Sequence, residues 1–215
     1  MRVAILISGR GSNMERLIES CKINNKSASI ELVFSNNAKA SGLSFAKNNS
    51  IKTSIIDHRV FEKREDFDHE LDKKLREKKI DFICNAGFMR ILSESFVNNW
   101  FNKQLNIHPS LLPDFKGLDV HKRVIESKTN ISGCTVHLVR AGVDEGPIIG
   151  QISTKVESND NEEILASKIL KLEHILYPVC LKLFSDNLIQ INDDKIIYSK
   201  EAIHQLDEIN GRLDK

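Results

Sequence analysis

The fold is decided by the stretch Val3-Ala4-Ile5-Leu6-Ile7-Ser8-Gly9-Arg10-Gly11-Ser12-Asn13. Five consecutive apolar residues followed at once by a glycine-containing turn are typical of a strand buried on both faces. A helix pattern then runs from Met14 to Cys21. Ser12 suits the N-cap of that helix, and Glu15 three residues later completes a capping-box pattern. The stretch therefore predicts a strand, a glycine loop and a helix whose N-terminal amides can meet an anion.

The glycine loop favours a monophosphate ligand over a nucleotide cofactor. It lacks the Gly-Lys-Ser/Thr ending of a Walker A loop, and Met14 breaks the GxGxxG pattern. The acidic residue that holds the ribose in dinucleotide-binding folds is replaced by Ser35-Asn36-Asn37. A tight capped turn without any ligand fits the loop equally well, so both interpretations stay open from the loop alone.

Strand and helix patterns alternate along the first half of the chain. Strands are expected at 30–34, 52–56 and 80–86, and helices at 40–48 and around Phe67, Leu71 and Leu75. Alternation of this kind predicts an α/β fold with a Rossmann-like, mostly parallel twisted sheet, right-handed crossovers and flanking helices.

The second half departs from this alternation. A short strand is expected at 105–108, and strand-like segments at 134–139 and 148–156 predict an antiparallel element. A long helix is expected over 161–184, kinked at Pro178, and a last strand at 195–199. The apolar side of the long helix is expected to contain Ile164, Leu165, Ile169, Leu172, Leu176, Val179 and Leu183.

Composition narrows the class of protein. The 215 residues include 31 basic and 30 acidic residues, a net charge of +1, which gives no support to nucleic acid as a partner. The chain has no apolar run near membrane-spanning length and no secretory signal pattern. Its four cysteines are scattered without a CxxC pair, which favours buried free thiols. A cytoplasmic location and small-molecule partners are therefore expected.

The stretch Asn106-Ile107-His108-Pro109-Ser110 has the strongest chemical signal. In an extended segment Asn106 and His108 face the same side. An amide that stabilises an oxyanion beside an imidazole that moves protons is suited to acyl transfer. Asp144, in the turn-rich segment 140–147, is the expected carboxylate partner of His108. The alternative is a polar turn in which Asn106 is a cap and His108 a surface group.

The other histidines are expected to have structural roles. His121 and His137 could join His108 and Asp144 around a metal, but no HExxH spacing is present and no metal is predicted. His137 alternates within an apolar strand and is expected to be a hydrogen-bonded core residue. His58, His69 and His204 lie among charged residues and are expected to be solvated. Ser110 lacks a GxSxG elbow, so it is expected to be a turn hydroxyl.

Four blocks of the chain resemble the phosphoribosylglycinamide formyltransferases, the folate-dependent transferases of purine biosynthesis and one-carbon metabolism. These blocks are Ser8–Asn13, Ala86–Leu92, Asn106–Pro113, and Ser132–His137 with Val143–Pro147. The similarity continues through Glu173–Pro178. It implies the formyltransferase fold in a single domain over 1–215, with a phosphate-binding half at 1–100 and a catalytic and folate-binding half at 101–215 that share one sheet.

The resemblance implies transfer of a formyl group from the co-substrate 10-formyltetrahydrofolate to the amine of 5'-phosphoribosylglycinamide. Asn106, His108 and Asp144 would be the catalytic trio. Asn106 would hold the oxyanion, His108 would donate a proton, and Asp144 would orient His108 and raise its pKa. The substrate would be bound by Gly11, Ser12, Asn13 and Glu173, the loop holding the phosphate and Glu173 the ribose hydroxyls.

The resemblance also implies a folate site formed by Arg64, Met89, Arg90, Ile91, Leu92, Asn106, Val139, Arg140, Ala141 and Val143. Arg64 and Arg90 would meet the glutamate tail; without the resemblance, Arg64 is a solvated charge on a charged helix. The Leu112-Pro113 bond is expected to be cis. Two departures from the family pattern, Asp119 and Lys122, put in doubt a supporting role for their loop. The assembly expected is a monomer or weak homodimer.

Three other functions stay open. Methionyl-tRNA formyltransferase shares the Asn106 and Asp144 blocks, but an additional tRNA-binding domain would be expected after residue 215. Formyltetrahydrofolate deformylase shares the trio but usually has a regulatory domain before it, whereas the first strand here begins near residue 2. A non-catalytic phosphoribosyl- or folate-binding module would keep residues 11–13 but would not need Asn106, His108 and Asp144 together.

Overall fold

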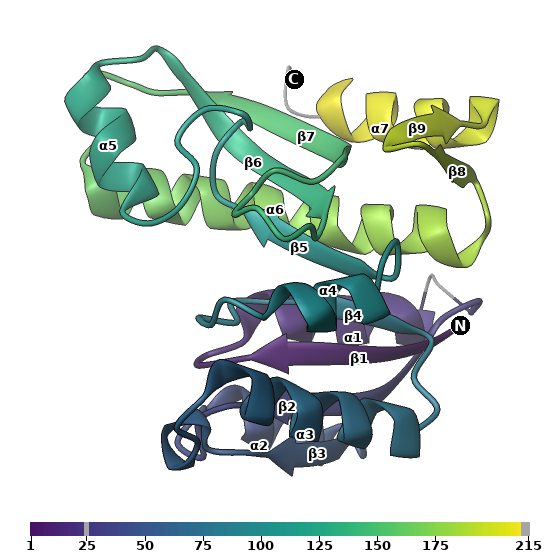
Figure 1. Ribbon diagram of the computed structural model, residues 1–215. Coiled ribbons are helices and arrows are strands. Elements are labelled where there is room, and N and C mark those ends of the chain that lie inside the picture. Colours follow the sequence, from purple (N-terminus) through teal and green to yellow (C-terminus); the bar gives the residue numbers. More distant parts are fainter. Residues whose placement is uncertain (24–25, 212–215) are drawn as a thin grey trace. The chain divides into compact units, whose positions relative to one another are not determined.

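The computed structural model describes residues 1–23 and 26–211 (Figure 1). Its larger sheet has the strand order β3-β2-β1-β4-β5-β6-β7. These strands are β1 (Arg2–Ile7), β2 (Ser29–Ser35), β3 (Lys52–Ile55), β4 (Phe82–Asn85), β5 (Gln104–His108), β6 (Ile131–Leu138) and β7 (Ile148–Lys155). The helices are α1 (Ser12–Ile23), α2 (Gly42–Asn48), α3 (Arg64–Glu77), α4 (Glu94–Asn99), α5 (Val120–Ser127), α6 (Glu162–Ser185) and α7 (Lys200–Gly211), with a 3₁₀ turn η1 (His58–Val60). A second sheet pairs β8 (Ile189–Asn192) with β9 (Lys195–Tyr198).

The predicted fold class is confirmed. Strands β1 to β5 pair in parallel wherever they are neighbours, and β6 pairs with β7 in antiparallel fashion. The strand expected at 195–199 is present as β9, but it belongs to the separate two-stranded sheet. Helices α4, α5 and α7 and strand β8 were not predicted, because their short or mixed patterns carry little periodicity. Among the described residues, no helix is long and apolar enough to cross a membrane.

Contacts divide the described chain into two compact units, the first formed by residues 1–106 with 139–141 and the second by residues 107–138 with 142–215. In the first unit β1 lies between β2 and β4, and Val3 to Ile7 are fully buried. Helices α3 and α4 cover one face of the strands, where Phe67, Leu71 and Leu75 pack against Ala4 and Leu6 (Figure 1). Helices α1 and α2 cover the other face. This covering of both faces explains the unbroken apolar run of β1.

The start of α1 differs from the prediction in one respect. The helix begins at Ser12, and the preceding Gly11 has a φ of +75°. The carbonyl oxygen of Gly11 accepts the first helical hydrogen bond, from the amide of Glu15 at 3.0 Å. Gly11 is therefore the N-cap in place of Ser12, because the turn out of β1 needs a positive φ that glycine adopts without strain.

In the second unit α6 packs on β6 and β7. Most of its predicted apolar side is confirmed, and Leu165, Ile169, Leu176 and Leu183 are fully buried. Ile164 is 41% exposed, so its assignment to this side was wrong; it lies one position ahead of Leu165, and successive helix positions point about 100° apart. The hydroxyl of Tyr198 donates to the β7 carbonyls of Ile148 (3.1 Å) and Ile149 (3.2 Å), which ties the small sheet to β7.

Two further predictions are confirmed. All four cysteines are free thiols, and Cys84, Cys134 and Cys180 are buried while Cys21 is half-buried. The Leu112-Pro113 peptide bond is cis.

Strand β6 approaches β7 so closely that position 133 has no room for a side chain. A Cβ added to Gly133 would lie 2.0 Å from the carbonyl oxygen of Ile152 and 2.6 Å from a methyl of Leu111. We expect Gly133→Ala to lower the free energy of unfolding by about 1–3 kcal/mol, because overpacking forces the backbone to shift. Urea denaturation followed by circular dichroism measures this change.

The matched control is Gly9→Ala, because a Cβ at Gly9 would meet nothing within 4 Å. It should change the free energy of unfolding by less than about 1 kcal/mol, because the added methyl group meets no neighbour. Equal losses in the two variants would contradict the close approach of β6 to β7.

Candidate active site

The glycine loop lines a pocket in the first unit. The pocket has a volume of about 290 Å³ and is bounded by Ser8, Gly9, Arg10, Gly11, Ser12, Asn13, Ala86, Gly87 and Met89. All three residues predicted to bind phosphate, Gly11, Ser12 and Asn13, are thus together at the N-terminus of α1. Helix α2 supports the loop from behind, where the amide of Gly42 donates to the carbonyl of Gly9 at 3.2 Å. The pocket therefore places loop backbone beside the N-terminus of α1, which is the positive end of the helix dipole. This combination suits an anion.

The segment predicted to contact the folate follows β4 and borders the same pocket through Met89. Met89 and Ile91 are 76% and 56% exposed, whereas Leu92 is buried in the core beneath α3 and α4. Arg90 is half-buried, and its guanidinium lies 4.6 Å from the centre of the Phe67 ring. The segment is therefore anchored through Arg90 and Leu92, while the apolar side chains of Met89 and Ile91 are exposed.

Arg64, the second predicted partner of the glutamate tail, is exposed at the first turn of α3. Val139, Arg140 and Ala141 also belong to the first unit. Arg140 is held by a 2.6 Å hydrogen bond to the side chain of Asn102 and lies 4.0 Å from the centre of the Phe101 ring. Val143 belongs to the second unit and is 47% exposed.

Asn106 lies on β5, half-buried, two positions before His108. Its register partner on β4 is Asn85, which accepts a 3.0 Å hydrogen bond from the side-chain amide of the buried Gln104. Register partners of parallel strands face the same side of the sheet, and so do residues two positions apart on one strand. The side-chain amides of Asn85, Gln104 and Asn106 therefore form a row on one face. The row of Asn85 and Gln104 was missed; amides at alternate positions 104 and 106 were the sequence signal for it.

His108, in the second unit, is 5% exposed. Its Nδ1 lies 3.2 Å from a carboxylate oxygen of Asp144, as predicted, and its Nε2 lies 3.0 Å from the carbonyl oxygen of Phe115. Both neighbours are hydrogen-bond acceptors, so only a doubly protonated ring would donate to both. The arrangement is therefore ready to hold an imidazolium once a proton arrives.

The pKa of His108 nevertheless lies below its ordinary value. Burial lowers it and has the largest effect, while the Phe115 carbonyl and the Asp144 carboxylate raise it and the charge of Arg123 lowers it. Asp144 does raise the pKa, as the family resemblance implies, but desolvation of the ring outweighs the carboxylate. In this conformation His108 is consequently a better proton acceptor near neutral pH than a ready donor.

Asp144 is the hub of this cluster. Its backbone has a φ of +53°, and the carboxylate oxygen that faces His108 also accepts from the amide of Gly117 at 2.9 Å. The other oxygen lies 3.5 Å from Nε2 of His137. Burial raises the pKa of Asp144, but the His137 and Gly117 hydrogen bonds and the nearby histidine charges lower it further, so the pKa is below its usual range.

His137 is buried, as predicted, and its Nδ1 lies 2.8 Å from the carbonyl oxygen of Leu138. Both ring nitrogens of His137 thus face hydrogen-bond acceptors, Nδ1 the Leu138 carbonyl and Nε2 the Asp144 carboxylate. Sequence reasoning preferred a core role for His137 and considered a place beside Asp144 only as part of a metal site. The described residues contain no group of three or more His, Cys, Asp and Glu side chains arranged to hold a metal ion.

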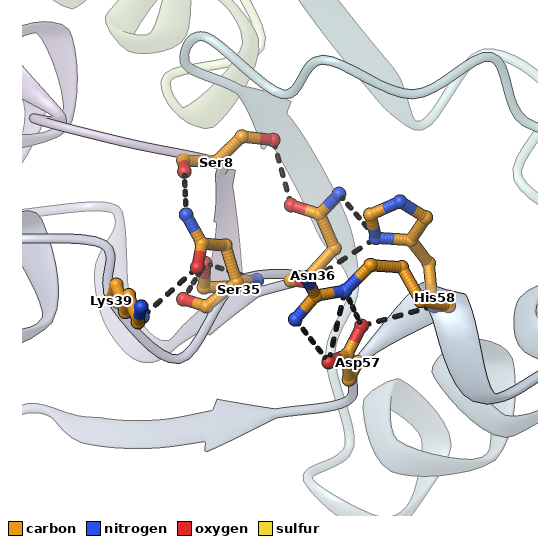
Figure 2. A network of polar contacts seen from close by, with 8 residues as sticks. Ser8, Ser35, Asn36, Lys39, Asp57 and His58 are labelled. Atoms are coloured by element: carbon orange, nitrogen blue, oxygen red, sulfur yellow. Dashed lines mark hydrogen bonds and ion pairs between the residues drawn. The ribbon is translucent and has the colours of Figure 1, made fainter.

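The remaining predicted side chains fall in separate places. Glu173 is on α6 in the second unit and is 8% exposed; burial and the charge of Glu173 raise the pKa of the Cys134 thiol. Ser110 is buried and its hydroxyl donates to the carbonyl of Asp114, a turn role as expected. His69 and His204 are exposed, but the prediction for His58 was wrong, because it is half-buried against Asn36 (Figure 2).

Comparison with known proteins agrees with this geometry. The family model for formyl transferases matches residues 1–181. The phosphoribosylglycinamide formyltransferase of Escherichia coli is 37% identical over 90% of this chain and 92% of its own length. The human trifunctional purine biosynthetic protein adenosine-3 is 44% identical over 93% of this chain, which spans only 20% of that longer protein.

Solved structures agree as well. The crystal structure of phosphoribosylglycinamide formyltransferase from Anaplasma phagocytophilum superimposes with a TM-score of 0.87 and 40% identity, covering 94% of this chain and 95% of that one. Glycinamide ribonucleotide transformylase 1 from Symbiobacterium toebii gives a TM-score of 0.89 and 34% identity, covering 93% and 94%. The chain belongs to the formyl transferase family and, within it, to the phosphoribosylglycinamide formyltransferases.

Proposed function

We propose that the chain transfers the formyl group of 10-formyltetrahydrofolate to the amine of 5'-phosphoribosylglycinamide, giving formylglycinamide ribonucleotide and tetrahydrofolate in de novo purine biosynthesis. The observation that carries this proposal is the buried His108–Asp144 pair, 3.2 Å apart, in a chain of this family. A buried imidazole with a carboxylate behind it is the arrangement that moves a proton during acyl transfer.

The proposed reaction balances with one proton transfer. The amine nitrogen attacks the formyl carbon, and the carbonyl electron pair moves onto oxygen. Collapse of this tetrahedral intermediate breaks the bond from carbon to N10 of the folate. The proton lost by the amine nitrogen ends on N10, and no step calls for a metal ion.

His108 is the proposed carrier of that proton. Its lowered pKa keeps the ring able to accept the proton of the attacking amine, and the imidazolium then returns the proton to N10. Asp144 and the Phe115 carbonyl are already aligned with the two ring nitrogens, so the cation forms beside two acceptors. For Nε2 to meet the substrate, it must exchange the Phe115 carbonyl for the reacting nitrogen.

Asp144 and Asn106 have distinct proposed roles. Asp144 holds the ring orientation and stabilises the imidazolium, and His137 with the Gly117 amide keeps this carboxylate ionised and fixed. Asn106 cannot titrate, so its proposed role is to donate hydrogen bonds to the oxyanion of the tetrahedral intermediate.

The proposed binding residues follow the pocket and the exposed segments. Gly11, Ser12 and Asn13 bind the phosphate, supported by their position around the 290 Å³ pocket at the N-terminus of α1. The buried carboxylate of Glu173 accepts from the ribose hydroxyls.

For the folate, Met89 to Leu92, Asn106 and Val139 to Ala141 with Val143 form the pterin site, and Arg64 and Arg90 bind the glutamate tail. We further propose that residues 1–215 act as one catalytic domain on small molecules in the cytoplasm, as a monomer or weak homodimer.

The acceptor distinguishes this proposal from related formyl-folate reactions. We expect the purified chain, given 10-formyltetrahydrofolate, to formylate phosphoribosylglycinamide at least about a hundredfold faster than charged initiator tRNA or water, because the pocket at α1 suits a phosphate monoester. Mass spectrometry of each product measures the three rates. If hydrolysis or formylation of tRNA is faster, water or tRNA is the acceptor in place of phosphoribosylglycinamide.

Substitution of the two reacting side chains should affect turnover more than binding. We expect Asn106→Ala to lower kcat by about 10²–10³, the usual cost of losing an oxyanion donor. His108→Ala should reduce kcat by a similar factor or more while tetrahydrofolate still binds, as calorimetry would show. The control His204→Ala removes an exposed histidine and should keep the wild-type rate. An unchanged kcat for His108→Ala would remove His108 from the mechanism.

The charge of Asp144 should be measurable at His108. Because the carboxylate raises the pKa of His108, Asp144→Asn should lower that pKa further below its ordinary value. Histidine-detected NMR titration gives the pKa, and Glu145→Gln, which removes an exposed carboxylate paired with Lys116, is the control. A pKa that rises in Asp144→Asn would mean that the 3.2 Å pair does not persist in solution.

A further inference from the structure

The hydroxyl of Ser8 joins two loops that serve different substrates in the proposed function. Ser8 follows β1 and opens the phosphate-binding loop. Its amide donates to the carbonyl of Gly87 at 3.0 Å, and its hydroxyl oxygen accepts from the amide of Met89 at 2.8 Å. One residue at the edge of the phosphate pocket is thus hydrogen-bonded through backbone and side chain to the segment that begins the folate site.

Both hydrogen bonds of the Ser8 hydroxyl have a direction that their partners fix. The Met89 amide can only donate, so the Ser8 oxygen accepts and its single proton goes to Oδ1 of Asn36 at 2.7 Å (Figure 2). The NH₂ group of Asn36 must then face Nδ1 of His58, 3.2 Å away. Nδ1 of His58 also lies 3.3 Å from the Asn36 carbonyl oxygen; it accepts from the Asn36 NH₂ group in the tautomer that has its proton on Nε2.

Neighbouring side chains hold the contacts from Ser8 through Asn36 to His58 in place. Asn36 is 4% exposed, and the neighbouring Asn37 donates from its side chain to the carbonyl of Ser8 at 3.2 Å. The His58 ring packs edge-on against Phe67, with 6.4 Å between ring centres, and the guanidinium of Arg90 lies 4.6 Å from the centre of the Phe67 ring. The same small group of side chains therefore contacts both the Met89 amide and the Arg90 side chain.

We propose that Ser8, oriented by Asn36 and His58, is a positioning residue that sets the backbone of Met89 to Leu92 for folate binding. The proposal rests on the proposed function of that segment. Ser8 fixes the Met89 amide, His58 supports the Phe67 ring on which Arg90 lies, and Asn36 connects the two. The hydroxyl acts through the segment and touches no reacting atom.

Loss of the hydroxyl should therefore weaken folate binding selectively. A hydrogen bond contributes about 0.5–1.5 kcal/mol net. We expect Ser8→Ala to raise both the Kd for tetrahydrofolate and the KM for 10-formyltetrahydrofolate about 2- to 12-fold, with kcat at saturation within about twofold of wild type. The KM for phosphoribosylglycinamide should stay within about twofold, because the Ser8 hydroxyl is hydrogen-bonded to Asn36 and Met89 and not to the phosphate loop.

Conservative and matched variants separate positioning from loss of structure. Ser8→Thr keeps the hydroxyl and should restore the wild-type Kd for tetrahydrofolate. His58→Phe keeps a ring against Phe67 but removes the acceptor, so it should raise the Kd in the same direction. The double variant Ser8→Ala/His58→Phe should equal Ser8→Ala alone, since both act through one link. Ser44→Ala, an exposed serine on α2, is the control and should leave Kd and kcat unchanged.

Each possible result of these measurements either supports or overturns the positioning role of Ser8. Parallel rises in both KM values, a Thr variant no better than Ala, or additive effects in the double variant would overturn the positioning role. Should Ser8→Ala fail to fold, the Kd values of Ser8→Thr and His58→Phe decide the matter in the same way. If the wild-type chain binds tetrahydrofolate but does not formylate phosphoribosylglycinamide, the proposed reaction fails while the calorimetric comparison still tests Ser8.

Discussion

Burial of β1 on both faces is the constraint on which the first unit depends. Its five apolar residues leave no side of the strand open to water, so helices must cover the sheet above and below. Parallel strands end at a common edge, and there Ser8 meets the loops that follow β2 and β4. Polar backbone at that edge has no strand partner, which is why ligand sites in open α/β sheets lie there.

In the second unit, the charges of His108 and Asp144 depend on the balance between desolvation and hydrogen bonding. Asp144 and His108 are both largely withdrawn from water, and either alone would be costly to bury in its charged form. Three donors converge on the carboxylate, from His108, His137 and the Gly117 amide, and they offset the cost for Asp144 more completely than the two acceptors do for His108. The carboxylate consequently stays charged while the ring tends to stay neutral.

The sequence predicted features that local periodicity or chain adjacency determines. The run of β1, the stripe of Phe67, Leu71 and Leu75 in α3, and the strand that ends in His108 are all of this kind, and all are present. The pairing of Asp144 with His108 was predicted because Asp144 lies in a loop after an apolar strand, helped by the family resemblance, and the structure brings the two together.

Features set by contacts between distant segments were missed. His58 looks solvated in its charged neighbourhood, and only the fold places it against Asn36, 22 positions away in the chain. Asn85 and Gln104 similarly become partners through strand register. The N-cap went to Gly11 instead of Ser12 because the turn required a positive φ, which a capping pattern does not encode.

The protonation of His108 and Asp144 links the stability of the fold to the proposed proton transfer. Both groups have pKa values lower in the folded chain than their ordinary values, so the unfolded chain binds more protons than the folded one in acid. The contribution of His108 is present above about pH 6.5 and is lost as pH falls through its folded pKa; that of Asp144 is present above about pH 4 and is lost likewise. The folded state therefore favours a neutral ring beside a charged carboxylate. In the proposed reaction that state accepts a proton from the amine, and the Asp144 carboxylate already faces Nδ1 of the cation that forms.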